Sequence, residues 1–104
     1  MNVLIVDDEP IVRIGLSTLV DWERHGYRLV GEAADGEEAL ALLDREHVDI
    51  VVTDIRMPKM DGIEMMRRIR SNRQDVAVLV LSCYDDFVLV KEAMKLGAKD
   101  YILK

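Results

Sequence analysis

Acidic, hydroxyl and basic side chains follow four largely apolar runs of this sequence, at the points where the runs end. The runs 3–6, 50–53, 78–81 and 101–103 are followed respectively by Asp7 with Asp8, by Asp54, by Ser82 and by Lys104. If the runs are parallel strands of one sheet, their carboxyl ends share one edge, and ligand sites in open α/β sheets lie outside that edge. Clustered carboxylates repel one another unless a cation neutralises them, and an all-oxygen shell suits Mg²⁺. The pattern therefore predicts a small cleft that holds Mg²⁺.

Alternating strands and helices would bring these side chains together. The expected strands cover 3–6, 28–34, 49–54, 77–82 and 101–103, and the expected helices cover about 10–20, 35–47, 63–70 and 85–96. The third strand is rich in β-branched residues, as in a strand covered on both faces, and the second fits an edge position. The alternation indicates right-handed βαβ crossovers. The predicted fold is α/β, a flavodoxin-like doubly wound five-stranded parallel sheet in the order 2-1-3-4-5.

Side-chain spacing within the expected helices predicts which residues face the core. Ile11, Ile14 and Leu19, with Thr18, form a helical stripe in the first helix, and Phe87, Val90 and Met94 are at helical spacing in the fourth. In the third helix, Ile63, Met66 and Ile69 are expected to face inward. A solvated outer face of the third helix is expected to hold Arg67, Arg68 and Arg70. Cys83 is expected to be a small buried apolar residue, and Trp22 a packing residue.

Length and composition limit the classes of function. A chain of 104 residues forms one domain around a single core. The formal net charge of −6 argues against a nucleic-acid surface, because phosphate neutralisation needs clustered Lys and Arg. The longest apolar run is too short to cross a bilayer, and Met1 leads directly into the first strand, so we expect a cytoplasmic domain that contacts no membrane. A single cysteine excludes an internal disulfide and a Cys-based zinc site.

Five motifs together resemble the receiver domain of two-component response regulators. They are Val6-Asp7-Asp8-Glu9-Pro10, Thr53-Asp54-Ile55-Arg56-Met57-Pro58, Met60-Asp61-Gly62, Ser82 and Asp100-Tyr101-Ile102-Leu103-Lys104. The match spans the whole chain in the family's order and spacing. It implies a regulatory phosphoacceptor domain, rather than an enzyme, in which Asp54 accepts a phosphoryl group from a sensor histidine kinase.

A metal site is also implied by the resemblance. Asp7, Asp8 and Asp54 would hold Mg²⁺ together with the backbone carbonyl of Arg56, and Asp8 is expected to be a direct ligand. Transfer of a phosphoryl group to a carboxylate needs little covalent help, but the charge on its three oxygens must be met by preplaced cations and donors. Mg²⁺ and Lys104 would supply that positive charge.

The resemblance further implies roles for residues around the phosphoryl group. Ser82 would donate a hydrogen bond to a phosphoryl oxygen, and the backbone N–H of Cys83 would add another donor. Tyr101 fits the family's aromatic switch, in which the ring moves after Ser82 is drawn toward the phosphoryl group. Arg56 and Tyr84 occupy positions that flank the route by which water attacks the phosphoryl group in this family.

Three other classes of protein remain open at this point. A Mg²⁺-dependent phosphoaspartate phosphatase of the haloacid dehalogenase type also uses a strand-end Asp, but it usually has a second Asp where this chain has Arg56. A flavodoxin shares the topology, but its flavin phosphate needs a Ser/Thr/Gly-rich loop in place of Asp7-Asp8-Glu9. A purely structural interaction module would not require the acidic residues. Release of phosphate with turnover would favour the phosphatase, and a yellow protein the flavodoxin.

The segments 21–27, 30–36 and 53–58 most resemble receivers that precede an AraC-type DNA-binding domain. This resemblance implies a downstream transcriptional output domain, and a single-domain receiver is the alternative. Receivers normally continue after the position of Lys104 with Pro and a fifth helix. We therefore expect residues 1–104 to be a receiver domain truncated after its fifth strand, with the fifth helix missing. An apolar face left uncovered beside the first helix would then favour self-association, for example as a homodimer.

Overall fold

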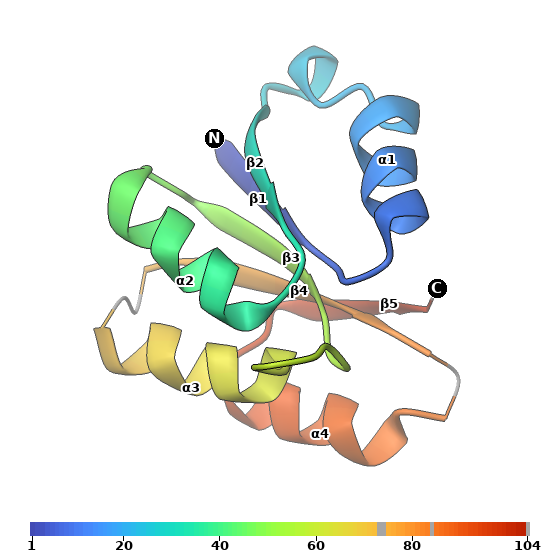
Figure 1. Ribbon diagram of the computed structural model, residues 1–104, viewed down its shortest axis with the longest axis vertical. Coiled ribbons are helices and arrows are strands. Elements are labelled where there is room, and N and C mark those ends of the chain that lie inside the picture. Colours follow the sequence, from blue (N-terminus) through green and yellow to red (C-terminus); the bar gives the residue numbers. More distant parts are fainter. Residues whose placement is uncertain (73–74, 84, 104) are drawn as a thin grey trace.

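Five parallel strands form a single sheet in the order β2-β1-β3-β4-β5 in the computed structural model, which describes residues 1–72, 75–83 and 85–103 (Figure 1). The strands are β1 (Asn2–Val6), β2 (Arg28–Ala33), β3 (Ile50–Asp54), β4 (Ala77–Ser82) and β5 (Asp100–Leu103). The helices are α1 (Pro10–Leu19), α2 (Gly36–Arg45), α3 (Gly62–Asn72) and α4 (Phe87–Lys95), with a 3-10 helix at Glu23–His25. The predicted flavodoxin-like topology is confirmed. Within the described residues, no helix combines the length and apolarity needed to cross a membrane.

The main hydrophobic core lies on the face of the sheet covered by α2, α3 and α4 (Figure 1). Strand residues that alternate toward this face, such as Leu4, Val51 and Val78, are fully buried, as expected for a central parallel sheet. Leu43 of α2 and Ile69 of α3 pack against them. These layers fix the strands whose ends carry the acidic residues.

The opposite face of the sheet packs against α1 and the segment that follows it (Figure 1). Its core is small and contains Val3, Val52 and Leu81, with Val12 and Leu16 of α1 packed on them. Trp22 is a packing residue there, as predicted, and its Nε1–H donates to the carbonyl of Leu16 at 2.9 Å. The ring of Tyr27 meets the Trp22 ring edge-on, with the two ring centroids 6.3 Å apart. α1 is therefore anchored by few side chains.

The predicted inward face of the first helix is wrong. Ile11, Ile14 and Leu19 are all exposed, and Leu19 keeps 86% of its surface accessible. Apolar residues occur around much of α1, and the side that meets the sheet is the one that carries Val12 and Leu16. Periodicity identified an apolar helix but selected the wrong side of it.

The prediction for the fourth helix is wrong at two of its three residues. Phe87 and Met94 are exposed, whereas Val90 packs against the main core and Ala93 is buried. Phe87 and Met94 instead line an open apolar groove between α4 and β5, together with Tyr101. The helix begins at Phe87 rather than at 85, because Asp86 takes the N-cap position.

Arg70 does not lie on a solvated face, as the sequence predicted for it. It is half-buried at the end of α3, and its guanidinium donates to the carbonyl oxygens of Val76, Leu96 and Gly97 at 2.7 to 3.1 Å. The reason is that α3 ends beside the loops that lead into β4 and β5, and these loops carry the three carbonyls. Arg67 and Arg68 are exposed, as predicted.

Candidate functional site

Four acidic side chains meet at the carboxyl-terminal edge of the sheet. Asp7 follows β1 and Asp54 ends β3, and both are buried, whereas Asp8 and Glu9 are exposed in the loop after β1. Each can offer a carboxylate oxygen to a position where all four oxygens lie within 4.8 Å of one another. The structure thus brings together the three predicted carboxylates and adds Glu9. Glu9 directly follows Asp7 and Asp8 in the sequence, and this adjacency was the signal that could have identified it.

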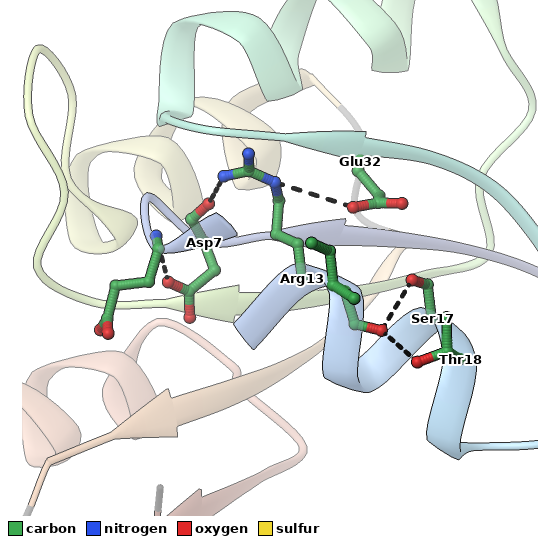
Figure 2. Close-up of polar contacts among 7 residues, drawn as sticks. Asp7, Arg13, Ser17, Thr18 and Glu32 are labelled. Carbon is green, nitrogen blue, oxygen red and sulfur yellow. Dashed lines mark hydrogen bonds and ion pairs between the residues drawn. The ribbon is translucent and has the colours of Figure 1, made fainter. Parts of the chain in front are cut away.

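The backbone of Asp7 is held from two sides. Its N–H donates to the carbonyl of Ala33 at 2.9 Å, and its own carbonyl accepts a hydrogen bond from the guanidinium of Arg13. Figure 2 shows the Arg13 side chain reaching from α1 between the Asp7 carbonyl and the carboxylate of Glu32, which is 3.7 Å away. The Asp7 carboxylate in turn accepts the N–H of Glu9 at 2.9 Å. Arg13 was not singled out from the sequence, because an arginine on a helix carries no local signal of this contact.

The Asp54 carboxylate is positioned by a tightly folded loop between β3 and α3. One of its oxygens accepts the N–H of Ile55 at 2.8 Å, and the hydroxyl of Thr53 donates to the Asp54 carbonyl at 2.8 Å. The loop returns at Gly62, whose N–H donates to the Ile55 carbonyl at 2.7 Å. A Cβ atom at Gly62 would lie only 2.4 Å from the Asp54 carbonyl oxygen, so this close approach requires glycine.

The hydroxyl of Ser82 lies at the same edge. Ser82 ends β4, one residue after Leu81, which pairs with Asp54 on the neighbouring strand. It is fully buried, and its Oγ has no hydrogen-bond partner among the described residues. A buried hydroxyl without a partner costs free energy, and such groups in native proteins need a reason such as a ligand or a functional state.

Cys83 is exposed, which contradicts the prediction that it is buried. β4 ends at Ser82, so Cys83 is already a loop residue and does not share the burial of the strand. Its backbone N–H, the predicted phosphoryl donor, donates at 3.0 Å to the carboxylate of Asp86.

The remaining predicted residues are placed as follows. The Arg56 side chain crosses from the loop after β3 to Asp86, with Nε 2.5 Å from Oδ1. That hydrogen bond raises the pKa of Arg56 above its usual value. Tyr101 is about half exposed on β5, at the groove beside α4. Lys104 and Tyr84 lie outside the described residues, so their predicted roles stay predictions. Asp86 was missed by the sequence analysis.

Residues 3–104 match the family model of the response regulator receiver domain. The chain belongs to this family. Among curated relatives, the uncharacterized transcriptional regulatory protein YesN of Bacillus subtilis is 39% identical over 103 residues, which are 99% of this chain and 28% of YesN. The transcriptional regulatory protein HptR of Staphylococcus aureus is 38% identical, over 99% of this chain and 40% of HptR. The receiver chain therefore spans well under half the length of these relatives.

Solved receiver structures share the same fold. The REC domain of AraT, a response regulator from Geobacillus stearothermophilus, is 42% identical with a TM-score of 0.93, covering 99% of this chain and 80% of that chain. The CheX–CheY–BeF3–Mg²⁺ complex from Borrelia burgdorferi contains a chain that is 37% identical with a TM-score of 0.88, covering 100% of this chain and 78% of that one. This receiver therefore has the fold of its relatives at high similarity across nearly all of its length.

Proposed function

We propose that this receiver accepts one phosphoryl group on Asp54, from a sensor histidine kinase, with Mg²⁺ bound by Asp7, Asp8 and Asp54. The observation that carries the proposal is the position of the buried Asp54 carboxylate, within reach of the other acidic groups and beside the buried Ser82 hydroxyl. Phosphoryl transfer needs this combination of an oxygen nucleophile, a metal and a preplaced donor. A domain of this kind is a regulatory phosphoacceptor.

The donor set fits a hard divalent cation. Four carboxylates can each place an oxygen within 4.8 Å of the others, a spacing that one ion can bridge, and all the donors are oxygens. As the resemblance to receiver domains implies, we assign Asp8, one of these four residues, as a direct ligand and the Arg56 carbonyl as a further ligand. When bound, Mg²⁺ would neutralise charge on these carboxylates and on phosphoryl oxygens.

The other residues assist in the proposed transfer. The Ser82 hydroxyl, which has no partner among the described residues, would donate to a phosphoryl oxygen. Lys104 would pair with the phosphoryl group as a point charge. Tyr101, which is half exposed beside α4, would move inward as Ser82 shifts and repack α4 against β5. Tyr101→Ala is expected to uncouple NMR shifts in α4 from phosphorylation.

Acetyl phosphate tests the phosphoacceptor assignment directly. Wild type is expected to gain a single phosphoryl adduct by mass spectrometry, only when Mg²⁺ is present. Asp54→Asn should gain none, and Asp44→Asn, which changes an exposed Asp on α2, should behave as wild type. An adduct that forms on Asp54→Asn at the wild-type rate would disprove the assignment. Steady release of phosphate from a small monoester would instead favour the phosphatase alternative.

We also propose that the phosphorylated receiver controls a transcriptional output carried by a further segment of the whole protein. Support comes from the relatives YesN and HptR, which are named as transcriptional regulatory proteins and are much longer than the matched region. In the whole protein, we propose that a fifth helix covers the apolar face beside α1, where Ile14 of α1 and Ile102 of β5 are exposed. A chain extended by about 15 residues, enough for one helix and its turn, should melt at higher temperature and self-associate less in sedimentation. An unchanged melting temperature would count against that helix.

A further inference from the structure

An ion pair joins the two loops that border the candidate site. Arg56 lies in the loop after β3, two residues after Asp54, and Asp86 lies in the loop after β4 at the start of α4. Their Nε and Oδ1 atoms are 2.5 Å apart. The Asp86 side chain is fully buried, whereas the Arg56 side chain is 64% exposed. A carboxylate is kept in a buried position at a high desolvation cost unless a charged partner offsets it, so Arg56 contributes to holding Asp86 there.

The second oxygen of Asp86 occupies the donor next to Ser82. Asp86 Oδ2 accepts the backbone N–H of Cys83 at 3.0 Å, and the N–H of Asp86 donates to the Cys83 carbonyl at 3.2 Å. These bonds close the turn that follows β4 from both ends. An Asp at the start of a helix usually caps a helix N–H, but the Asp86 side chain makes no such capping bond. It faces the turn and Arg56 instead.

Engagement of Asp86 conflicts with the role proposed for the Cys83 N–H. One N–H carries one proton, so it cannot make a full hydrogen bond to Asp86 and to a phosphoryl oxygen on Asp54 at once. Ser82, directly before it, is buried, and its hydroxyl has no partner among the described residues. Recruiting these two donors to the phosphoryl group requires the turn to move.

We propose that the Arg56–Asp86 ion pair is a latch that holds the turn after β4, and with it the Cys83 N–H, in the unphosphorylated conformation. The inference rests on the proposed phosphorylation of Asp54. Phosphorylation draws the turn toward Asp54, Asp86 releases the Cys83 N–H, and the start of α4 moves with it. Arg56 and Asp86 are positioning residues in this scheme, because neither contacts the transferred group. The strength of the pair then sets how readily the domain reaches its phosphorylated conformation.

Removal of either partner should favour the phosphorylated conformation. Arg56→Met retains the backbone carbonyl assigned to the metal, and Asp86→Ala removes no capping bond. We expect each variant to bind the phosphoryl mimic BeF3⁻, with Mg²⁺, about five- to tenfold more tightly than wild type, within the range of typical coupling factors. In the absence of BeF3⁻, the Cys83 amide signal of Asp86→Ala should move toward its position in BeF3⁻-bound wild type.

A double variant separates the latch from a direct effect of Arg56 on the phosphoryl group. If the two residues act as one unit, the double variant should bind BeF3⁻ no more tightly than either single variant. If Arg56 acts directly, Arg56→Met should still change the affinity in the Asp86→Ala background. The matched control is Arg67→Met, which breaks an exposed pair between α3 and α4, with Arg67 3.1 Å from Glu92, and should leave the affinity unchanged.

The BeF3⁻ affinities of wild type, the single variants and the double variant, measured by NMR titration, decide between the alternatives. Tighter binding in both single variants, without further gain in the double variant, supports the latch. Unchanged or weaker binding in the single variants overturns it, and weaker binding would show that the pair prearranges the site instead. If wild type binds no BeF3⁻ and takes no phosphoryl group from acetyl phosphate, the proposed function itself fails. In that case the latch fails with it.

Discussion

Polar groups are satisfied differently at the two ends of the parallel sheet. At the amino-terminal end, the Asp49 carboxylate accepts the N–H of Asn2 at 2.7 Å and contacts His47 at 3.0 Å. Arg70 donates there to three carbonyls. At the carboxyl-terminal end, four acidic groups crowd together and the buried Ser82 hydroxyl has no partner among the described residues. The polar groups at the first end are paired within the fold, whereas the second end holds the four acidic groups of the candidate site together with the Ser82 hydroxyl.

This difference has an energetic meaning. A buried polar group without a partner costs about 1–3 kcal/mol, which is a large fraction of the stability of a small domain. Functional sites are where proteins commonly retain such costs, because the same groups are needed for binding or chemistry. Substitutions at the amino-terminal end should therefore reduce stability without affecting phosphorylation. Removal of polar groups at the carboxyl-terminal end should impair phosphorylation without reducing stability.

Gly62→Ala should give the largest loss of stability. It tests whether the backbone at the carboxyl-terminal end of the sheet is loosely packed. Its new Cβ would lie 2.4 Å from the Asp54 carbonyl oxygen, a backbone atom that cannot move aside easily. We expect a loss of about 3 kcal/mol in the free energy of unfolding, at the upper end of overpacking effects, measured by urea denaturation. Gly31→Ala is the control, because its Cβ would make ordinary contacts of 3.6 Å with Leu4 and Leu42. Equal stability of the two variants would contradict the close approach.

Arg70→Met should give the second-largest loss of stability, and it should leave phosphorylation unaffected. The variant loses the three donations to the carbonyls of Val76, Leu96 and Gly97 but keeps an apolar stem of similar length. We expect a loss of about 2 kcal/mol in the free energy of unfolding, since hydrogen bonds of charged groups contribute more than neutral ones but are not additive. The rate of phosphorylation by acetyl phosphate should not change. Arg68→Met is the control: among the described residues its guanidinium makes one exposed ion pair, 3.8 Å from Glu64, so the variant should remain within about 0.5 kcal/mol of wild type.

The strands were predictable because their signals are local, and their order followed from the topology rules of alternating α/β chains. Buried parallel strands form short apolar runs, and their ends carried the carboxylates that the structure brings together. The helix faces were harder to predict. α1 has apolar residues on more than one side, and only the packing of the sheet selects Leu16 over Ile11. Cys83 was misplaced because one residue separates the end of a buried strand from an exposed loop.

Contacts between distant segments left no sequence signal. Arg56 and Asp86 are 30 residues apart, and neither residue type at its position indicates that the two side chains meet. Arg70 followed two exposed arginines by only a few residues and was therefore assigned to the same solvated face. Its actual partners are backbone carbonyls, which every residue carries and which a sequence cannot distinguish. The carboxylates of the candidate site were predictable, but the residues that position them were not.

Ser82→Ala should separate stability from function. The substitution removes a buried hydroxyl that has no partner among the described residues. The free energy of unfolding should therefore stay the same or rise by up to about 1 kcal/mol. The rate of phosphorylation by acetyl phosphate should fall at least tenfold, as a lost donor to a developing charge typically costs that much or more. Ser17→Ala removes an exposed hydroxyl that donates to the Ile14 carbonyl at 3.1 Å and should change neither measurement noticeably (Figure 2). A destabilised Ser82→Ala variant would mean that polar groups stabilise the fold at the carboxyl-terminal end of the sheet as they do at the amino-terminal end.

Asp49→Asn should have the smallest effect, and it should depend on pH. The N–H of Asn2, with a contribution from His47, lowers the pKa of the Asp49 carboxyl below its usual value. The unfolded chain therefore binds a proton at this residue more readily than the folded protein does, and the stabilisation is complete above the unfolded pKa and lost as pH falls through the folded one. Urea midpoints of wild type should exceed those of the variant near neutral pH, and the difference should shrink below about pH 5. If the difference stays constant as the pH is lowered, the charge of Asp49 does not stabilise the amino-terminal end of the sheet.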